Sequence, residues 1–591
     1  MFLKRESREG PFFANSTRQA GGGKTRLGGF SSYTPGRSSQ TSHITCRVGN
    51  LMFTVDQIIV LGYLVGVAAF GAWFVFFTRN SDEFMSAGQS IPGWAMGLSI
   101  FGSYISTLSF MGNPADAYRD NWNPLVFLLA TPLAALAASK FFVPFYRRTG
   151  EVSAYHHLEH RFGPWARTYG VVCFVLMQIV RLGMITQLLA TVVAPLFGWD
   201  VGWMIIFLGC IITIYPMLGG TEGIIWAGVV QSLVMMLGVV ACVYFLIAGV
   251  PGGVGEIVRI GFEAKEFGPW GKFSLGPGSQ ALVSDKSNFT FNLYVASFWV
   301  VLLKGLEEHM RNFAVDQSYI QRYISSKSER DAQRSVWYGV LMYVPTACLF
   351  FFIGAALYAY TQVHPEWLPD DPVHPGQKIG AKGVFPYFIN NNLPIGLKGL
   401  VIAAIASAAL DSNLNCMATL FLKDVYRRYF RPNASEKESM RILHVSTLIF
   451  GILSICFAFV ALGYNDILKT WWTWGGLASG GIFGLFLLGV LCPKTSSRQA
   501  AIGVIISVLV SFWMTLSLKD IWPYVESFLT AQLGFSASAM ETVSLFRSPY
   551  DSLMIPFFGT ILIFQIGGIL GIISPRRIGS PGAGEAGSGR G

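Results

Sequence analysis

Long apolar windows, separated by shorter polar stretches, recur along most of the chain. Each window is long enough to cross the roughly 30 Å of hydrocarbon in a bilayer. The windows begin near Ile58, Trp94, Pro124, Tyr169, Val201, Gly223, Phe291, Val336, Leu397, Ile442, Leu468, Ala500 and Ser552. This pattern predicts an all-α polytopic membrane protein with about thirteen transmembrane helices.

The composition agrees with a membrane protein. Hydrophobic residues make up 52% of the 591 residues and charged residues only 13%, whereas soluble domains are about a quarter charged. Most of the eight cysteines lie in or beside apolar windows. They predict neither a metal-type pair nor a disulfide framework.

The basic residues lie where a membrane topology would place them. The chain has 43 Lys and Arg against 33 Asp and Glu, a net charge of +10. Basic groups such as Arg147–Arg167, Arg322–Arg334 and Arg427–Arg441 follow odd-numbered windows, and Lys and Arg collect in cytoplasmic loops. We therefore predict an external amino terminus, a cytoplasmic carboxyl terminus and no nucleic-acid partner.

The two ends of the chain differ in composition from the rest. Residues 1–51 are basic, are rich in Gly and Ser, and lack the apolar core of a signal peptide. We predict a disordered extension; a start of translation at Met52 is the alternative, because this topology would carry the basic segment outside. Residues 52–578 form the predicted transmembrane domain, and residues 579–591 a disordered cytoplasmic tail.

The second window contains too many small polar residues for a simple apolar helix. Leu98–Pro114 reads LSIFGSYISTLSFMGNP, in which hydroxyls compete for the backbone and Gly and Pro weaken the helical ladder. One interpretation is a small-residue packing face. The other is a discontinuous helix whose free backbone groups line a cavity at mid-membrane depth.

A second polar run, five windows later, is KGLEEHMRN at Lys304–Asn312. It can lie at the membrane edge with its long side chains reaching water. Alternatively, it interrupts a second helix at the position that corresponds to the first. Two such interruptions indicate an inverted-repeat transporter with its binding site between them.

Arg181 lies in the fourth window among apolar and neutral polar residues. Exposure to lipid would cost at least ~2.5 kcal/mol at the bilayer centre, so the side chain is expected to face the bundle interior. Its planar guanidinium suits a carboxylate. We interpret it as a site for an anionic solute, with a structural ion pair to Asp411 or Glu307 as the alternative.

Asp411 is a second intramembrane charge, within AAIASAALDSNLN at 403–415. In a helix, Ser407, Asp411 and Asn415 fall on one face and form a stripe of oxygen ligands. Such a stripe suits Na⁺, which unwound carbonyls of a facing broken helix would also bind. A proton-relay carboxylate and a purely structural Asp remain alternatives.

Other motifs predict little chemistry. In HHLEH (156–160), Leu158 separates His157 from Glu159, whereas a zinc-protease helix has Glu directly after its first His. No glycine-rich phosphate loop or nucleophile motif is present in the sequence. We therefore predict no catalytic residues, no cofactor and no metal other than a coupling ion.

Several stretches together resemble the sodium/solute symporters, and the resemblance extends from about Asp56 to Pro575. They are SDEFMSAG (81–88), PFYRRTGEVSAYHHLEHRF (144–162), MLGGTEGIIWAGVVQ (217–231), DQSYIQRY (316–323) and LNCMATLFLKDVYRR (414–428). The resemblance implies a LeuT-like fold, an inverted five-helix repeat with broken helices and extra spans. It also implies a multi-pass protein of a bacterial-type inner (plasma) membrane.

Within that family, Ile100–Asn123 and the QIVRLG around Arg181 are most similar to the branch that carries sialic acids. The resemblance assigns Ser106 and Ser109 to polar groups of the solute and Arg181 to its carboxylate. To these we add His309 and Asn312 from the second polar run. The position at which glucose-type members bind a hydroxyl through Glu is Leu128 here, so a plain hexose is less expected than an anion.

The resemblance also implies cation ligands, with departures. Carbonyls match Gly102, Ile105 and Ile405, but the usual hydroxyl positions are occupied by alanines, Ala408 and Ala409. The Asp of a second Na⁺ site is replaced by Gly228, while its usual hydroxyl partner coincides with Asp411. We hypothesise that Asp411 restores the lost carboxylate from the opposite wall, with Ser407 as a lesser ligand.

These inferences predict a secondary active symporter, coupled to Na⁺ or to H⁺, that imports a small anionic sugar acid such as sialic acid by alternating access. Its partners would be the solute, the ion and the lipid bilayer. A sugar or monocarboxylate symporter of the same fold, with Arg181 structural, is one alternative. A membrane sensor that has lost transport is another.

Overall fold

The computed structural model describes residues 45–48, 51–78, 80–277, 289, 291–371, 377–408, 413–463, 467–479, 481–519 and 521–574. Most of the predicted amino-terminal extension, the predicted tail and Asp411 lie outside these residues. The domain boundaries assigned from the sequence therefore stay a prediction. Two short antiparallel strands, β1 (Thr45–Val48) and β2 (Leu51–Thr54), precede the first helix.

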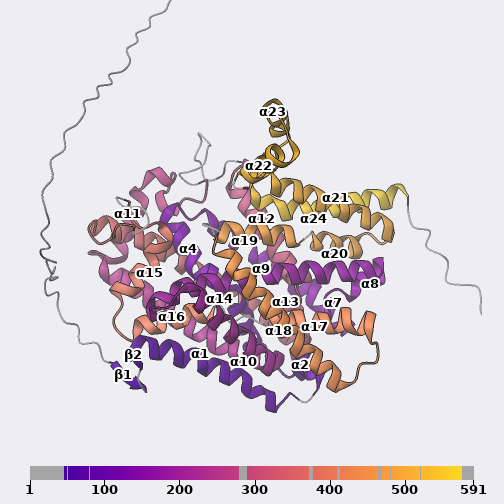
Figure 1. Cartoon of the computed structure of the whole chain (residues 1–591), viewed down its shortest axis with the longest axis horizontal. Coiled ribbons are helices and arrows are strands. Elements are labelled where there is room, and N and C mark those ends of the chain that lie inside the picture. Colours follow the sequence, from indigo (N-terminus) through magenta and orange to yellow (C-terminus); the bar gives the residue numbers. More distant parts are fainter. Residues whose placement is uncertain are drawn as a thin grey trace, which may run out of the picture. The chain divides into compact units, whose positions relative to one another are not determined.

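The described chain is otherwise helical (Figure 1). The helices before residue 290 are α1 (Val55–Trp73), α2 (Ser81–Ser86), α3 (Gly93–Tyr104), α4 (Thr107–Arg119), α5 (Val126–Leu129), α6 (Thr131–Ala137), α7 (Val143–Thr149), α8 (His156–Phe162), α9 (Pro164–Phe197), α10 (Val201–Gly249) and α11 (Gly253–Glu263). Later come α12 (Phe298–Val315), α13 (Gln317–Ser325), α14 (Glu329–Val363), α15 (Ala381–Asn392), α16 (Leu397–Ser407), α17 (Asn413–Leu420) and α18 (Glu436–Ala461). The last are α19 (Ile467–Ser479), α20 (Ile482–Leu491), α21 (Ser497–Leu516), α22 (Trp522–Leu533), α23 (Ala537–Leu545) and α24 (Ile555–Ile573).

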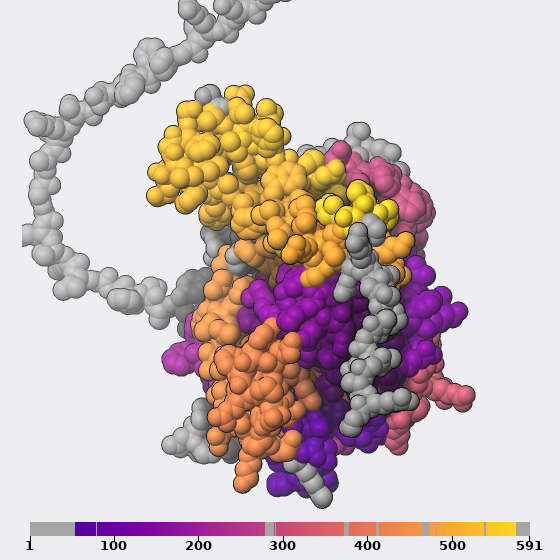
Figure 2. All heavy atoms as spheres, turned by 90° about the vertical axis from the view of Figure 1, so that its right-hand side faces the viewer, coloured from indigo at the N-terminus to yellow at the C-terminus, as the bar shows by residue number. Residues whose placement is uncertain are grey.

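Short helical turns connect these elements. Six are 3₁₀ or π segments between helices: η1 (Phe74–Phe76), η2 (Ala87–Gln89), η4 (Ala138–Phe142), η5 (Lys265–Phe267), η6 (Gly271–Phe273) and η7 (Phe421–Phe430). Two more, η3 (Asn123–Leu125) and η8 (Ser552–Met554), lead directly into α5 and α24. Figure 2 shows the carboxyl-terminal helices (gold and yellow) gathered along one edge, beside the purple segment that contains α8.

The apolar windows coincide with helices, so the all-α membrane class is confirmed. In the described part of the chain, nine helical stretches are long and apolar enough to cross a bilayer, and two of them, Asn123–Thr149 and Thr473–Leu491, each run through consecutive shorter helices. One of them, α10, contains two predicted windows, joined at Gly220 with non-helical φ 57° and ψ −163°. The remaining windows fall on pairs of shorter helices, and the count of thirteen crossings stays a prediction.

The first interruption is confirmed. Helix α3 ends at Tyr104 and α4 begins at Thr107, because Ile105 and Ser106 adopt extended backbone conformations. The side chain of Ser106 caps α4 by accepting the N–H of Ser109 at 3.4 Å. The serine and glycine residues that weakened the helical prediction therefore do mark a break, two residues long.

The second predicted interruption is wrong in position. Helix α12 is continuous through Lys304–Asn312, and the break comes at Asp316, whose backbone is extended. Lys, Glu and Arg are good helix formers, and here they pair with each other three and four residues apart along the helix. Asp316 ends the helix because its side chain caps α13, accepting the N–H of Ser318 at 2.8 Å.

A close helix contact sets the position of α12 against the segment that follows α4. A Cβ atom on Gly305 would lie 2.3 Å from the carbonyl oxygen of Phe127. Only glycine allows this approach, which brings the polar face of α12 beside η3 and α5. The opposite case is Gly66 in α1, where an added Cβ would have no atom within 4 Å.

We predict that Gly305→Ala lowers the thermal midpoint of the purified protein in detergent. Overpacking of a close contact costs about 1–3 kcal/mol, and α12 would have to move away from Phe127. Gly66→Ala, also a change within an apolar helix, is the matched control and leaves the midpoint within error. Equal midpoints for both variants would contradict this account of the contact.

On the predicted external side, Lys272 fastens the loop before α12 to the end of α4. Its side chain is fully buried, and its ammonium donates to the carbonyls of Tyr118 and Asp120 at 2.5 and 2.9 Å. It also lies 3.2 Å from the centre of the Phe267 ring and 4.2 Å from that of Tyr358. The outer half of the first broken helix is thus tied to the loop that leads into the second.

Burial lowers the pKa of Lys272 to about 7, although Asp120 and Glu266 favour its charged form. The unfolded chain keeps the ordinary pKa of about 10.4. Between these values the unfolded state binds more protons, so this group makes stability rise with pH by up to about 1.4 kcal/mol per unit. Below about pH 7 the lysine is protonated in both states and contributes no slope.

We therefore predict that Lys272→Arg removes part of the rise in thermal midpoint between pH 7 and pH 9. Arginine stays charged throughout this range, so the variant isolates the titration of one group. The measurement is the difference between wild-type and variant midpoints across the pH series in one detergent. A constant difference would show that Lys272 does not titrate there.

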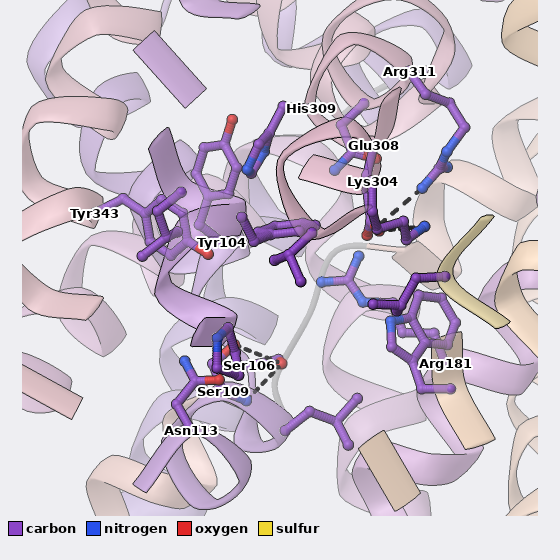
Figure 3. Close-up of a pocket in the computed structure, with 18 of the residues that line it drawn as sticks. Tyr104, Ser106, Ser109, Asn113, Arg181, Lys304, Glu308, His309, Arg311 and Tyr343 are labelled. Carbon is purple, nitrogen blue, oxygen red and sulfur yellow. Dashed lines mark hydrogen bonds and ion pairs between the residues drawn. The ribbon is translucent and has the colours of Figure 1, made fainter. Parts of the chain in front are cut away.

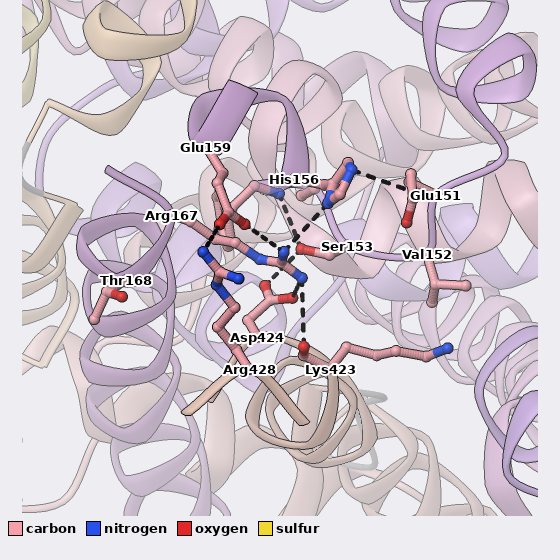
Figure 4. Close-up of polar contacts among 12 residues, drawn as sticks. Glu151, Val152, Ser153, His156, Glu159, Arg167, Thr168, Lys423, Asp424 and Arg428 are labelled. Atoms are coloured by element: carbon pink, nitrogen blue, oxygen red, sulfur yellow. Dashed lines mark hydrogen bonds and ion pairs between the residues drawn. The ribbon is translucent and has the colours of Figure 1, made fainter. Parts of the chain in front are cut away.

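At the predicted cytoplasmic end, an ion-pair cluster joins α8, α9 and η7 (Figure 4). Arg167 donates to Glu159 at 2.7 Å and pairs with the buried Asp424, which also accepts from Ser153. Arg428 pairs with Glu159 as well. Burial alone would raise the pKa of Glu159, but its hydrogen bond to Arg167 and the nearby charges lower it.

Candidate functional site

A cavity of about 170 Å³ lies where the two broken helices face α9 and α14 (Figure 3). The helix break after α3 places polar groups on the wall of the cavity. The charged face of α12 lies on the other side of the cavity. The polar lining residues are Ser103, Tyr104, Ser106, Ser109, Asn113, Asn123, Arg181, Lys304, Glu308, His309, Arg311, Asn312, Asp316, Tyr319 and Tyr343. The cavity is therefore lined by many polar groups, although the surrounding helices are mostly apolar.

All five residues assigned to the solute from the sequence line this one cavity: Ser106, Ser109, Arg181, His309 and Asn312. Ser106 and Ser109 lie on α4 with their hydroxyl oxygens 3.5 Å apart. Figure 3 shows them with Asn113 on one side and Arg181 on the other. The arrangement offers hydroxyl and amide groups opposite a cation.

Arg181 is half-buried on α9 and donates to the carbonyl of Ser103 at 3.2 Å. That carbonyl is neutral and belongs to the last turn of α3, where the helix dipole favours a cation. Glu307, considered as its ion-pair partner, lies 3.8 Å from Lys304 and 3.7 Å from Arg311, and accepts from Thr560 at 3.4 Å.

The charged face of α12 contains two cations and two anions. Lys304 lies 2.9 Å from Glu308, and Arg311 lies 3.7 Å from the other oxygen of Glu308. Together with Glu307 these charges sum to zero, so the cluster stays buried without net charge. One interpretation of the sequence placed this cluster at the membrane edge, yet Lys304, Glu307 and Arg311 are buried within the protein and Glu308 is partly buried.

Aromatic residues close another side of the cavity. The Tyr104 ring stacks on Tyr343 with centroids 4.5 Å apart and meets the edge of His309 at 5.9 Å. The Nε2 atom of His309 lies 2.8 Å from the hydroxyl of Thr131. His309 therefore lines the cavity with its ring held by Thr131 of α6 and by Tyr104.

The described residues assigned to a cation lie on α3, at the break between α3 and α4, and on α16. The Thr107 hydroxyl donates to the carbonyl of Ile405 at 3.1 Å, which joins α4 to α16. Gly102 packs against α10: a Cβ there would lie 2.8 Å from the hydroxyl of Ser232. Ser407 donates to the carbonyl of Ala403 and hydrogen-bonds to Tyr63 of α1, so its hydroxyl is directed toward α1.

The hydrogen bond from Thr107 to Ile405 places the break between α3 and α4 beside α16. The hydrogen bond between Ser407 and Tyr63 links α16 to α1. Gly102 lies one turn before the end of α3. Asp411, the carboxylate proposed to complete a cation site, lies outside the described residues.

One charged residue was wrongly interpreted from the sequence. Arg322 was counted among the cytoplasmic loop residues, but it is buried in α13. Its guanidinium donates to the hydroxyls of Ser99 and Ser103 and to the carbonyl of Ser318. The positive-inside pattern assigned Arg322 to that loop because α13 ends close to it. The serines of α3 were the sequence signal that could have identified its partners.

Residues 84–507 match the sequence profile described as the sodium:solute symporter family. The chain belongs to the sodium:solute symporter family. Membership confirms the family resemblance and makes the chain a multi-pass membrane transporter that couples a small solute to Na⁺, and not an enzyme.

Individual sodium:solute symporters are similar over most of their length. The sodium/sialic acid symporter SiaT of Proteus mirabilis is 29% identical over 461 residues, covering 77% of this chain and 88% of the relative. The sodium-coupled monocarboxylate transporter 1 of Homo sapiens is 25% identical over 550 residues, covering 87% and 86%. A solved substrate-bound, outward-open Na⁺-coupled sialic acid symporter has a TM-score of 0.74 at 26% identity, covering 88% of this chain and 98% of that one.

Proposed function

We propose that this chain imports an anionic sugar acid, such as sialic acid, by Na⁺-coupled symport. The observation that carries the proposal is the position of Arg181 on the cavity wall opposite Ser106 and Ser109. A guanidinium binds a carboxylate through a planar fork, while hydroxyls and amides bind the hydroxyls of a sugar. The similarity to sialic acid symporters supports the same solute class.

In this proposal Arg181 exchanges its bond to the Ser103 carbonyl for the carboxylate of the solute. Ser106 and Ser109, together with Asn312 and His309, contact the remaining polar groups. The amino end of α4 points toward the cavity, so its dipole adds to the attraction for an anion. A neutral hexose would use the hydroxyl-binding side but would leave Arg181 without a carboxylate.

We also propose the position of the coupling ion. The carbonyls of Gly102, Ile105 and Ile405 would bind Na⁺ together with Ser407 and Asp411, and the hydroxyl of Thr107 holds Ile405 next to the break. Oxygen ligands of this kind suit a hard monovalent cation. Protonation of Asp411 in place of Na⁺ binding is the alternative coupling reaction.

The orientation follows from the charge pattern. With the amino terminus outside and the carboxyl terminus in the cytoplasm, Na⁺ enters from outside and favours the outward-open state with solute bound. Either ligand shifts the conformational equilibrium only by its difference in affinity for the two states. The proposed location is the inner (plasma) membrane of a bacterial-type cell.

A monocarboxylate is the second candidate solute. The human relative named a sodium-coupled monocarboxylate transporter covers 87% of this chain, and Arg181 would bind any carboxylate. Short monocarboxylates, however, have few or no hydroxyl or amide groups for the polar side chains of α4 and α12 to bind. The two solutes can be compared directly in one assay.

We predict Na⁺-dependent uptake of labelled N-acetylneuraminate into proteoliposomes that contain the purified protein. The assay compares an inward Na⁺ gradient with choline, with and without an inward proton gradient, and uses excess unlabelled pyruvate or glucose as competitors. Uptake of labelled pyruvate is measured in parallel under the same gradients. Uptake driven by Na⁺ alone, and resistant to glucose, supports the proposal. Uptake driven only by protons, or of pyruvate alone, would contradict it.

We predict that Arg181→Gln raises the KM for N-acetylneuraminate about 10- to 100-fold, the loss of a charged hydrogen-bonded pair of about 1.5–3 kcal/mol. Arg181→Lys keeps the charge but loses the planar fork, so its KM falls between those of wild type and Arg181→Gln. Initial rates of uptake are measured over a range of solute concentrations for each reconstituted variant, which gives KM and the maximal rate separately. A KM within threefold of wild type for Arg181→Gln would show that Arg181 is structural.

A further inference from the structure

Two neighbouring carboxylates of α12 share the same cationic partners but face different surroundings. Glu307 and Glu308 both pair with Lys304 and with Arg311. Among the described residues, Glu308 lines the cavity and Glu307 does not. A carboxylate oxygen of Glu307 instead accepts from the hydroxyl of Thr560 on α24. The Glu307 carboxylate is therefore directed toward α24 and away from the cavity.

Burying these ion pairs costs free energy, which indicates that they have a function. Burying ion pairs within a membrane protein is expensive, and well-packed apolar residues in their place are often equally stable or more so. The pair between Glu307 and the two cations can be explained by packing against α24. The same explanation does not account for Lys304 and Glu308, which both reach the cavity.

The chemistry of this pair fits uncharged polar groups. A carboxylate accepts from a hydroxyl or an amide N–H, and an ammonium donates to a hydroxyl or carbonyl oxygen. A solute hydroxyl can do both at once beside a pair 2.9 Å apart. A second carboxylate would gain little there, because each positive charge of the cluster is already balanced by Glu307 or Glu308.

The surroundings hold the pair in position. Arg311, the second partner of Glu308, has a guanidinium nitrogen 3.1 Å from the sulfur of Met177 on α9. Gly305, one residue after Lys304, allows the close approach of α12 to Phe127. The pair thus faces the cavity from a helix that packs closely against Phe127.

We propose that Lys304 and Glu308 form a second polar subsite, which binds hydroxyl or acylamino groups of the solute and selects polyhydroxylated acids over short monocarboxylates. This inference rests on the proposed function, in which Arg181 binds the carboxylate. A site built to hydrogen-bond a hydroxyl discriminates against analogues without one, because the donor and acceptor positions that the ion pair leaves over then go unmatched.

The test compares Glu308→Gln with Glu307→Gln in proteoliposomes. Both variants remove one negative charge from the same cluster, so general effects of charge and stability are matched. The readouts are KM and maximal rate for labelled N-acetylneuraminate, and the inhibition constant of unlabelled pyruvate. Glu308→Asp, which keeps the carboxylate but shortens the side chain, is included in case Glu308→Gln is not recovered as a monodisperse protein.

We expect Glu308→Gln or Glu308→Asp to raise the KM for N-acetylneuraminate about tenfold or more, with the inhibition constant of pyruvate changed less than threefold. Glu307→Gln is expected to leave both values within threefold and to alter the maximal rate at most. Equal changes in KM for the variants at 307 and 308 would overturn the subsite and leave the proposed function intact. Wild-type uptake of pyruvate without any N-acetylneuraminate would overturn both.

Discussion

The structure depends on one constraint: within a bilayer, every charge and every free backbone group needs a partner inside the protein. The break between α3 and α4 releases backbone groups within the helical bundle. Their neighbours are polar side chains from distant segments, including Thr107 on the Ile405 carbonyl and Arg181 on that of Ser103. Ser103 and Arg181 are among the residues that line the cavity.

The same constraint explains the charged residues of α12 and α13. The two cations and two anions of α12 lie within one helix and compensate each other: Lys304, Glu307, Glu308 and Arg311. Arg322 is partnered by serines of α3 instead. Helix α3, which precedes the first break, is therefore bonded to α13, which follows the second.

A single broken helix thus contacts both proposed ligand sites. Ser106 and Ser109 face the cavity, whereas Gly102 and Ile105, a few residues earlier, belong to the proposed cation site. Movement of the α3–α4 junction on binding one ligand would change the site of the other. This gives the family's coupling of Na⁺ to solute a structural basis in this chain.

How much could be predicted from the sequence follows from which interactions are local. The first break was predictable because its signal, a cluster of Ser and Gly, lies at the break itself. The second break was wrongly predicted within the charged run of α12. Charged residues can interrupt a membrane helix, but pairs such as Lys304 with Glu308 can equally stabilise one. The capping residue Asp316 was the better signal for the break. Arg322 was misplaced because its partners lie more than 200 residues away, on α3. Asp411 has a prediction but no described position.

The most direct test of the central claim is reciprocal binding on the purified protein. The Kd of N-acetylneuraminate is measured by calorimetry in Na⁺ and in choline, and the Kd of Na⁺ is measured with and without saturating solute. If both ligands act through the α3–α4 junction, each raises the affinity for the other by the same factor, about fivefold or more. Solute binding with the same Kd in Na⁺ and in choline would contradict the account.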